Sequence, residues 1–265
     1  MNAMTRRGFI GKGSCAVGAA LCACGRPGLA RANPLKMPVG VQTYVVRDKI
    51  GKDFNGTLRQ LAGMGYQSIE MCSPPGYGKD WELLTRLTAA QMREAIRAAG
   101  LSCESCHYSF AELQNHLDER IAYAKDLGLA QMIVSGFWLK KEAAMEDWRQ
   151  AAAECNRMGE RVKKAGLQLG FHNHHFEFAQ IGGALIYDEL LGKLDPELVK
   201  MQFQVAVVNI GYKAVTYFRK YPGRFISLHL ADYSSDLKKS VPVGQGIVDW
   251  KELFAERSEE RRVGK

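Results

Sequence analysis

Residues 148–174 read WRQAAAECNRMGERVKKAGLQLGFHNH, and this stretch decides how the rest of the chain is interpreted. Its first part, Trp148 to Ala165, has the pattern of an amphipathic helix. Gly166 follows, where the end of a helix needs a positive φ that glycine adopts without steric cost. The short apolar run Leu167 to Phe171 then predicts a strand. The stretch therefore predicts a helix, a glycine cap and a strand in succession.

The same succession occurs three times earlier in the chain, with Gly65, Gly100 and Gly128 between the helix and the apolar run. Thr88-Ala-Ala-Gln91 is a capping box, which opens the helix that ends at Gly100. Helices that alternate with strands indicate a parallel sheet. We predict seven strands, over residues 39–45, 67–72, 101–107, 132–136, 167–174, 201–208 and 225–230.

These strands and the helices between them predict an α/β fold, a (β/α)8 TIM barrel that lacks the eighth strand in this chain. A helix starts at residues 249–254, and we expect a truncation or frameshift beginning near Arg257. The alternative is a doubly wound open sheet of seven strands. Its phosphate-binding fingerprint, GxGxxG or GxxxxGK[ST], does not follow the first predicted strand.

The N-terminus has the features of a twin-arginine signal peptide. Residues 5–12 read TRRGFIGK, a weakly apolar stretch follows, and Ala30-Arg31-Ala32 gives an A-x-A cleavage site. We therefore divide the chain into a signal peptide at 1–32, a barrel at 33–256 and a tail at 257–265. This predicts the twin-arginine translocase as a partner during export, and a periplasmic or extracellular location. Leu21-Cys22-Ala23-Cys24 is a distorted lipobox, so we do not expect lipidation.

The charge of the chain lies mostly at its two ends. Of the net +8, residues 1–32 contribute five positive charges and the last nine residues contribute +2, so the middle is close to neutral. The sequence therefore does not support a basic nucleic-acid-binding surface. No apolar stretch long enough for a membrane-spanning helix follows the first thirty residues.

The cysteines do not form a zinc-binding pattern. Cys72, Cys103, Cys106 and Cys155 lie outside the leader, and no second CxxC or HxxxH accompanies the CxxC spacing at 103–106. In an oxidising compartment a disulfide could form, and the sequence does not define its pairing. The oligomeric state is also left open by the sequence.

The fifth predicted strand carries the strongest chemical signal. Residues 171–178, FHNHHFEF, hold three of the six histidines of the chain. Alternate side chains of a strand share a face, so His172 and His174 point the same way. Two imidazoles at the end of a barrel strand suit a divalent metal or proton transfer. The alternative is a hydrogen-bonded histidine cluster that binds nothing.

Polar residues also end the neighbouring strands, at the barrel edge where active sites lie. Their alternatives are an acid turned toward a helix or solvent, or a histidine satisfied in the core. Asp232 could orient a histidine or cap the following turn, and an aromatic residue after the fourth strand could stack on a sugar ring. The residues at these ends are Glu70, His107, Trp138, Gln202, Gln204, His229 and Asp232. Of these, Gln202 and Gln204 lie on one face of their strand.

Four runs resemble the xylose-isomerase-like TIM-barrel family of sugar phosphate isomerases and epimerases, whose relatives include inosose dehydratases and hydroxypyruvate isomerases. They are HNHHFEF at 172–178, YPGRF at 221–225, HLAD at 229–232 and VGQGIVDW at 243–250, and the resemblance covers Pro38 to Phe254. It implies one divalent metal (Mn, Zn, Co or Mg) bound at the strand ends, with His172 and His229 as ligands. At the third position Gln204 replaces the Asp of the family, the eighth-strand Glu is absent, and Ala231 stands where a Lys is often found.

We therefore predict an exported carbohydrate isomerase, epimerase or related lyase that moves a proton between adjacent carbons of a sugar or keto-sugar with the help of a metal. Two alternatives remain. Gln204 and Ala231 favour a non-catalytic sugar-binding or inactive relative, whereas the neutral middle of the chain and the export signal argue against a metal-dependent DNA-repair endonuclease. The predicted roles are catalytic for Glu70, His107 and His174, substrate-binding for Trp138, Asn173, Glu177 and Asp232, and metal-binding for His172, Gln204 and His229.

Overall fold

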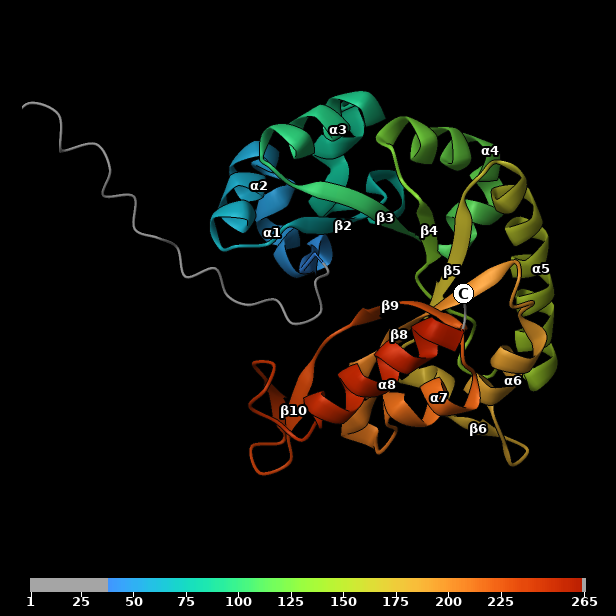
Figure 1. Cartoon of the computed structure of the whole chain (residues 1–265). Coiled ribbons are helices and arrows are strands. Elements are labelled where there is room, and N and C mark those ends of the chain that lie inside the picture. The colour runs from blue at the N-terminus through green and yellow to red at the C-terminus, as the bar shows by residue number, and fades with distance from the viewer. Residues whose placement is uncertain (1–37, 264–265) are drawn as a thin grey trace, which may run out of the picture. The chain divides into compact units, whose positions relative to one another are not determined.

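The computed structural model describes residues 38–263, and of residues 259–263 it describes the backbone only. The predicted signal peptide therefore lies outside the described residues. Seven parallel strands form one sheet in which every strand pairs with its neighbour along the chain (Figure 1). They are β1 (Gly40–Gln42), β2 (Ser68–Cys72), β3 (Ser102–Tyr108), β4 (Gln131–Val134), β5 (Gln168–His172), β8 (Val199–Gln204) and β9 (Phe225–His229).

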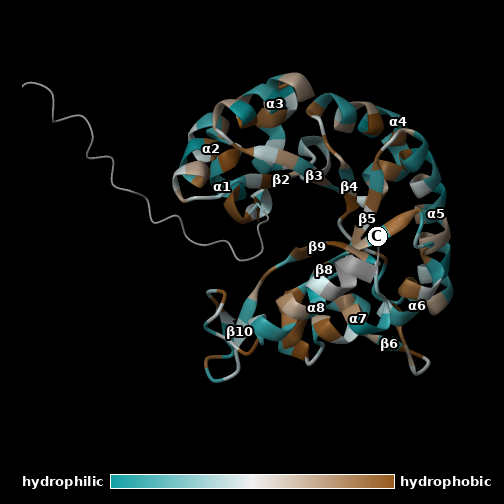
Figure 2. Cartoon of the chain, viewed as in Figure 1, coloured by the Kyte–Doolittle hydropathy of each residue, from teal (hydrophilic) through white to brown (hydrophobic). Residues whose placement is uncertain are grey.

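Helices cover the outer side of this curved sheet, and their outward faces are the more hydrophilic ones (Figure 2). The α-helices are α1 (Arg47–Ile50), α2 (Phe54–Gly63), α3 (Ala89–Ala98), α4 (Phe110–Leu127), α5 (Met145–Lys164), α6 (Ile186–Lys193), α7 (Ala214–Lys220) and α8 (Trp250–Val263). Short 3-10 helices are η1 (Thr43–Val46), η2 (Pro74–Gly76), η3 (Lys79–Arg86), η4 (Phe176–Phe178) and η5 (Val205–Ile210). Two hairpins, β6 (Gln180–Ile181) with β7 (Ala184–Leu185) and β10 (Asp232–Ser234) with β11 (Lys239–Val241), complete the part of the chain that is described.

The strand order confirms the barrel class and excludes the doubly wound alternative. A doubly wound sheet reverses its strand order at a switch point, whereas here the order follows the chain from β1 to β9. Within residues 38–263 the sheet has seven strands, so it forms an open half-barrel with β1 and β9 at its edges. Figure 1 shows the opening between these two ends of the arc.

The predicted helix ends are also confirmed. Thr88 caps α3, its hydroxyl accepts the Gln91 N–H at 3.2 Å, and the Gln91 side chain accepts the Thr88 N–H at 2.8 Å. Such a reciprocal pair satisfies two N–H groups that the helix start leaves free. The four glycines between helix and strand have φ values of 97°, 78°, 86° and 84°; they are Gly65, Gly100, Gly128 and Gly166.

Four predicted strands extend two or more residues past the observed ends, and in two of them a glutamine explains the error; the strands predicted at 132–136 and 167–174 end at Val134 and His172, so His174 lies beyond β5. The strand predicted at 39–45 ends at Gln42, and the strand predicted at 201–208 ends at Gln204; a 3-10 helix follows each. The Gln42 side chain accepts the Tyr44 N–H at 2.5 Å, and the Gln204 side chain accepts the Ala206 N–H at 3.4 Å. The valine-rich sequences beyond these caps have strand propensity, but the local side-chain bonds turn the backbone out of the sheet.

The inner face of the sheet has an aliphatic layer beneath its polar end. A Cβ added at Gly170 would lie 2.6 Å from the Ile133 Cδ1 and 3.1 Å from the Ile226 Cδ1, so both isoleucines fill the space beside this glycine. His172 follows two residues later on β5 and shares that face. The barrel interior is thus packed below the strand ends, as a barrel core requires.

Two further findings concern membranes and thiols. Among residues 38–263, no helix combines the length and apolarity that a membrane crossing requires. Among the described residues, Cys72, Cys103, Cys106 and Cys155 are free thiols, and all of them except Cys103 are buried.

Close packing at Gly51 gives a test of the fold. A Cβ there would lie 1.7 Å from the Asp80 carbonyl oxygen, which belongs to the backbone and has little freedom to move. We expect Gly51→Ala to lower the free energy of unfolding by about 1–3 kcal/mol through overpacking. Gly63→Ala in α2 is the matched control, because nothing lies within 4 Å of its added Cβ. We expect it to be neutral or stabilising by up to about 1 kcal/mol. Urea denaturation measures both, and equal effects would contradict the packing at Gly51.

Candidate functional site

Four titratable side chains meet at the carboxyl ends of four strands. Glu70 comes from β2, His107 from β3, His172 from β5 and His229 from β9. The three imidazole rings form a triangle, with centroids 4.4–5.2 Å apart. Each ring offers a possible ligand atom, and these three atoms lie within 4.8 Å of one another. The structure thus brings together residues that are up to 159 positions apart in the sequence.

Both oxygens of the Glu70 carboxylate are used. Oε1 is shared by two rings, at 2.7 Å from the His229 Nε2 and 3.0 Å from the His107 Nε2. Oε2 accepts the Ser105 hydroxyl at 2.6 Å and an amide N–H of Gln202 at 2.8 Å. Charge-assisted bonds of this kind are among the strongest in proteins. Glu70 therefore ties three other strands to β2.

The surroundings of Glu70, His107 and His172 shift the pKa values of these three groups in different directions. Burial by itself would raise the pKa of Glu70, but the charge and hydrogen bonds of His107 and His229 hold that pKa well below its usual range. Burial would lower the pKa of His107, yet Glu70 and Gln202 raise it above its usual value. Burial and the neighbouring imidazoles lower the pKa of His172 well below the ordinary value. The cluster therefore pairs an ionised carboxylate with one ring that favours a proton and one that does not.

Gln202 and Ser227 belong to the same network, and the sequence analysis gave neither a role in the site. The Gln202 side chain is 1% exposed. Its carbonyl oxygen lies 2.7 Å from the His107 Nε2, and its amide nitrogen donates to Glu70 and, at 2.9 Å, to the Ser227 hydroxyl. The alternation of two glutamines on this strand was visible in the sequence. Their partners on β2, β3 and β9 were not.

Two β-bulges set the register of the network. The pairing of β2 with β3 shifts after Ile69, so that Glu70 lies opposite Ser105 and Glu104 is the extra residue. The pairing of β8 with β9 shifts after Met201, so that Gln202 lies opposite Ser227. A bulge re-aims the side chains that follow it and is common beside active sites.

Gln204, the predicted third metal ligand, takes a different position. Its side-chain oxygen accepts the Ala206 N–H at the start of η5, and its backbone N–H donates to the Asn173 side chain at 3.2 Å. Among the described residues, the histidine grouping that could hold a metal contains His107 in its place. Asn173 is fully buried, and its carbonyl oxygen supports the β8 backbone.

An aromatic wall extends from the imidazole cluster toward the surface. The His174 ring lies 4.9 Å from His172 and 4.8 Å from the Trp138 ring, and Phe176 stacks on His174. The Trp138 indole donates to the Ser135 carbonyl at 2.7 Å, while its side chain remains 61% exposed. Trp138 has a φ of 52°, an uncommon conformation for a non-glycine residue. Burial and the nearby histidines lower the pKa of His174 to about 4, so this ring is neutral at neutral pH.

Asp232 and Glu177, the other two predicted substrate-binding residues, are buried, and their carboxylates accept hydrogen bonds from backbone N–H groups. The Asp232 carboxylate accepts the indole N–H of Trp250 at 2.8 Å and four backbone N–H groups, from Tyr233, Gly244, Gly246 and Val248. It therefore fixes the loop between β9 and α8, which agrees with the turn-capping role considered from the sequence. Glu177 is fully buried and accepts the His174 N–H at 2.7 Å.

The cluster fits a divalent cation. The Nδ1 atom of His172 is buried without a hydrogen-bond partner, beside two further imidazoles. Neutral imidazole nitrogens are preferred ligands of zinc and of related transition metals. Together with a neutral His174 at the rim, the arrangement can support proton transfer at a small molecule whose polar end enters the cluster.

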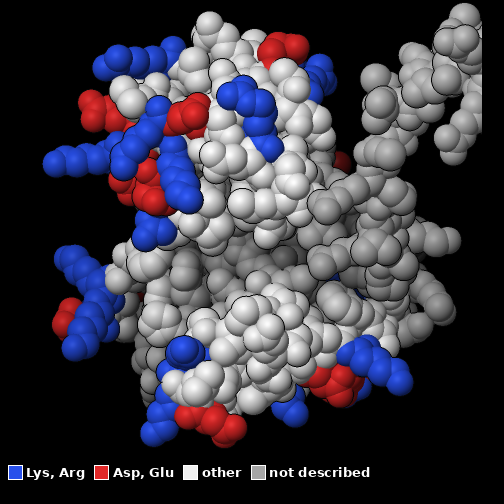
Figure 3. Space-filling view, turned by 90° about the vertical axis from the view of Figure 1, so that its left-hand side faces the viewer, with Lys and Arg blue, Asp and Glu red and all other residues white. Residues whose placement is uncertain are grey.

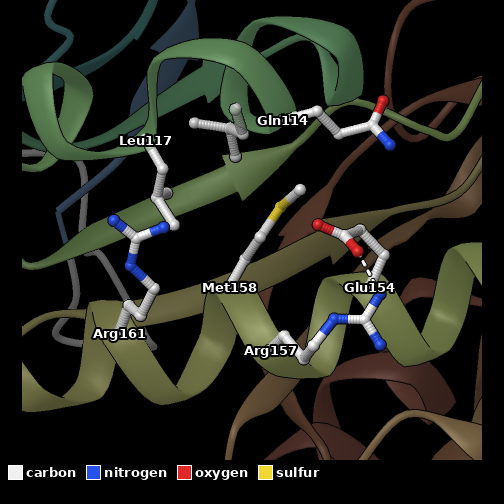
Figure 4. Close-up of a pocket in the computed structure, with 7 residues that line it drawn as sticks. Gln114, Leu117, Glu154, Arg157, Met158 and Arg161 are labelled. Carbon is white, nitrogen blue, oxygen red and sulfur yellow. Dashed lines mark hydrogen bonds and ion pairs between the residues drawn. The ribbon is translucent and has the colours of Figure 1, made fainter.

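A hollow lies away from the strand ends, between α4 and α5 (Figure 4). Leu117 and Met158 line it, and Arg157 and Arg161 lie at its rim. Arg157 pairs with Glu154, and Arg161 pairs with Asp118. Both guanidinium groups are already paired with carboxylates. This hollow is therefore a weaker candidate for binding a charged ligand than the histidine cluster at the strand ends. Figure 3 shows another face, where basic and acidic side chains lie close together without a continuous basic patch.

Comparisons with known proteins agree with the barrel fold. A family model described as xylose isomerase-like TIM barrel matches residues 58–258. An inosose dehydratase of Lacticaseibacillus casei is 27% identical over 88 residues, which cover 33% of this chain and 29% of that protein. The chain thus matches less than a third of the length of this curated relative.

Two solved structures have similar folds. A sugar phosphate isomerase/epimerase from Parabacteroides distasonis has a TM-score of 0.67 at 25% identity, covering 84% of this chain and 82% of the other. The IolI protein with a bound zinc atom has a TM-score of 0.66 at 12% identity, covering 84% and 85%. At that lower identity the second similarity concerns the fold alone.

The burial of Glu177, next to the aromatic wall, can be tested through the pH dependence of the free energy of unfolding. Burial raises the pKa of Glu177 to about 8, although hydrogen bonds from backbone N–H groups lower it in part. Because this pKa exceeds the value in an unfolded chain, the folded protein retains a proton that the unfolded protein releases. The free energy of unfolding should therefore fall as pH rises toward 8, by at most about 1.4 kcal/mol per pH unit, and level off above it.

Glu177→Gln removes this titration and keeps an oxygen for the His174 N–H. We expect its stability relative to the wild type to increase between pH 6.5 and 8, as measured by denaturant unfolding at several pH values. Exposed Glu82→Gln is the control and should leave the slope unchanged. A wild-type slope that Glu177→Gln does not alter would show that Glu177 is ionised throughout this range.

Proposed function

The chain belongs to the xylose isomerase-like TIM barrel family, and we propose that it is a carbohydrate isomerase, epimerase or related dehydratase that moves a proton between adjacent carbons. The observation that carries this proposal is the Glu70 carboxylate shared by the His107 and His229 rings, with a third imidazole beside them. Such a cluster provides both a carboxylate and imidazoles of different basicity at the strand ends of a barrel.

The chain's own residues supply the acid–base chemistry. In an isomerisation, the hydrogen on the carbon beside a carbonyl leaves as a proton and returns to the neighbouring carbon. We assign the acceptor role to His174, because its ring is neutral and lies at the rim next to His172. Glu70 orients His107 and His229 through its contacts with their Nε2 atoms. A positioned acid–base group of this kind contributes about 10²–10⁴-fold to a rate.

A divalent cation fits the three imidazoles of His107, His172 and His229. When bound, such an ion polarises a carbonyl and the adjacent hydroxyl, which makes the neighbouring carbon-bound hydrogen more acidic. His172 has the buried, unpartnered ring nitrogen that is consistent with this assignment. The neutral state of His172 also suits a ligand, because a protonated ring cannot bind a cation.

Two observations support the proposed class of substrate: the aromatic wall at Trp138 and the names of the similar proteins. The exposed indole of Trp138 offers a flat apolar surface, and the hydrogens of one face of a sugar or cyclitol ring can pack on it. The similar proteins are named as an inosose dehydratase and a sugar phosphate isomerase/epimerase, so their names point to cyclic polyols and keto-sugars. We infer a small keto-sugar or cyclitol ketone as the ligand.

A second function, non-catalytic sugar binding, is favoured by one departure from the family pattern. Gln204 and Ala231 replace an acid and a lysine at positions where the resemblance implies them. Loss of these groups weakens catalysis, while the exposed Trp138 face that would bind a sugar remains. The two functions differ in whether a carbon-bound hydrogen exchanges with solvent.

We also propose that the protein acts outside the cytoplasm, after export through the twin-arginine translocase and cleavage after Ala32. The support is the TRRGFIGK sequence at 5–12 and the Ala30-Arg31-Ala32 site. On this proposal the working protein is the barrel at 33–256 with the tail at 257–265.

The acid–base proposal is tested by exchange in D₂O. We expect the mature protein with Mn²⁺ to incorporate deuterium into a 2-ketose such as D-fructose or into a cyclitol ketone, monitored by proton NMR. His229→Ala should lower the exchange rate by about 10²-fold or more and weaken cation binding. His116→Ala is the matched control, because this exposed histidine lies on α4. Sugar binding without exchange in the wild type would favour the second function.

The export proposal predicts a dependence on the arginine pair. Replacing both Arg6 and Arg7 by Lys should reduce the periplasmic amount of the protein by more than about tenfold, because translocation requires the pair. Arg26→Lys is the control and should leave export unchanged. Cell fractionation and N-terminal sequencing measure the outcome, and export that persists without the arginine pair would refute the assigned route.

A further inference from the structure

We propose that Gln202 is a positioning residue of this site, and that it, rather than Gln204, is the β8 amide on which the arrangement of Glu70 and His107 depends. The inference rests on the proposed function only in taking the imidazole cluster as the reaction centre. It concerns a residue that contacts no substrate in this assignment and acts through its neighbours.

Every hydrogen-bonding group of the Gln202 amide has a partner. A glutamine amide has one acceptor oxygen and two N–H donors. Here the oxygen faces the His107 Nε2 at 2.7 Å, and the nitrogen donates to the Glu70 Oε2 at 2.8 Å and to the Ser227 hydroxyl at 2.9 Å. Turning the amide over would bring its oxygen against the carboxylate. The orientation of Gln202 is therefore fixed by Glu70.

A fixed Gln202 in turn fixes the His107 ring. The His107 Nε2 faces two oxygen acceptors, the Gln202 oxygen and, at 3.0 Å, the Glu70 Oε1. Two acceptors at one ring nitrogen require a hydrogen on that nitrogen, so the neutral ring carries its lone pair on Nδ1. Gln202 is the only residue among these partners that contacts both Glu70 and Ser227, and it thereby links β2 and β3 to β9.

The backbone of the neighbouring strands supports the same role independently of the amide. The bulge on β9 places Ser227 opposite Gln202, where regular pairing after Met201 and Phe225 would place Ile226, which has no hydroxyl. The bulge on β3 likewise places Ser105 opposite Glu70. Each irregularity supplies a hydroxyl to one end of the contact between Gln202 and Glu70. Two bulges at the same level indicate that the network is a built feature of the site.

Gln204 lacks these contacts although it has the same side chain on the same strand. Its oxygen accepts the Ala206 N–H at 3.4 Å, a contact within its own segment. Gln202 and Gln204 therefore provide a matched comparison, because the residue type and the strand are the same and only the contacts differ.

The test compares Gln202→Met with Gln204→Met, since methionine keeps the length of glutamine and removes its hydrogen bonds. The first readout is the ring nitrogen NMR spectrum of protein labelled with ¹⁵N-histidine, with the His107 signals assigned from a His107→Gln variant. The second is the affinity for Zn²⁺, measured by competition with a chromophoric chelator. Circular dichroism checks that each variant is folded.

We expect Gln202→Met to shift the His107 ring signals and to weaken Zn²⁺ binding by about 10–100-fold, the usual effect of losing a group that orients metal ligands. Gln204→Met should leave His107 unchanged and keep Zn²⁺ affinity within about threefold of the wild type. Ser227→Ala gives a milder variant should Gln202→Met fail to fold, and it should shift the same His107 signals to a smaller extent.

Unchanged His107 signals in both Gln202→Met and Ser227→Ala would overturn the inference. So would a loss of Zn²⁺ affinity confined to Gln204→Met, which would make Gln204 a ligand. If the wild type binds no Zn²⁺, the cation in the proposed function fails, and the His107 signals alone then decide the role of Gln202.

Discussion

One carboxylate oxygen shared by two imidazoles determines the organisation of this site. The Glu70 Oε1 can lie within 3.0 Å of both His107 and His229 only if β2, β3 and β9 curve toward one another. The helices behind each strand and the aliphatic layer around Gly170 maintain that curvature from outside and from below. In return, the buried charge of Glu70 is stabilised by the groups that it draws together, so the site is itself a cross-link between distant strands.

Much of the fold could be predicted from local patterns. The glycine caps and the Thr88 capping box depend on residues close in sequence, and they define where helices end and strands begin. Two of the strand ends that were wrong also depend on a local effect, a glutamine that caps its own turn, but the apolar sequence beyond Gln42 and Gln204 has the stronger strand signal. A sequence pattern shows the spacing of apolar residues. It does not show where a side chain forms a local hydrogen bond that replaces a backbone bond of the β-sheet.

The site was accessible from sequence only in part. Histidines at strand ends could be found because barrels place function there, and the structure brings His107, His172 and His229 together. The contact between Gln202 and Ser227 could not be found, because it depends on a register shift between β8 and β9 that changes the pairing by one residue. A bulge leaves no reliable mark in composition or periodicity. Long-range side-chain pairing is therefore visible only in the folded structure.

The two bulges also determine what kinds of genetic change this site tolerates. Each consists of a single extra residue, Glu104 on β3 or a residue at Ile226 on β9, and side chains alternate in direction along a strand. Deletion of the extra residue at either position would leave a regular ladder in which Ser105 still pairs with Glu70 and Ser227 with Gln202, so the later side chains of that strand would keep their direction. A substitution at Glu104, which is exposed, would leave that direction unchanged. The lineage of such a barrel can therefore exchange or lose the extra residue of either bulge while the pairings that follow it stay the same.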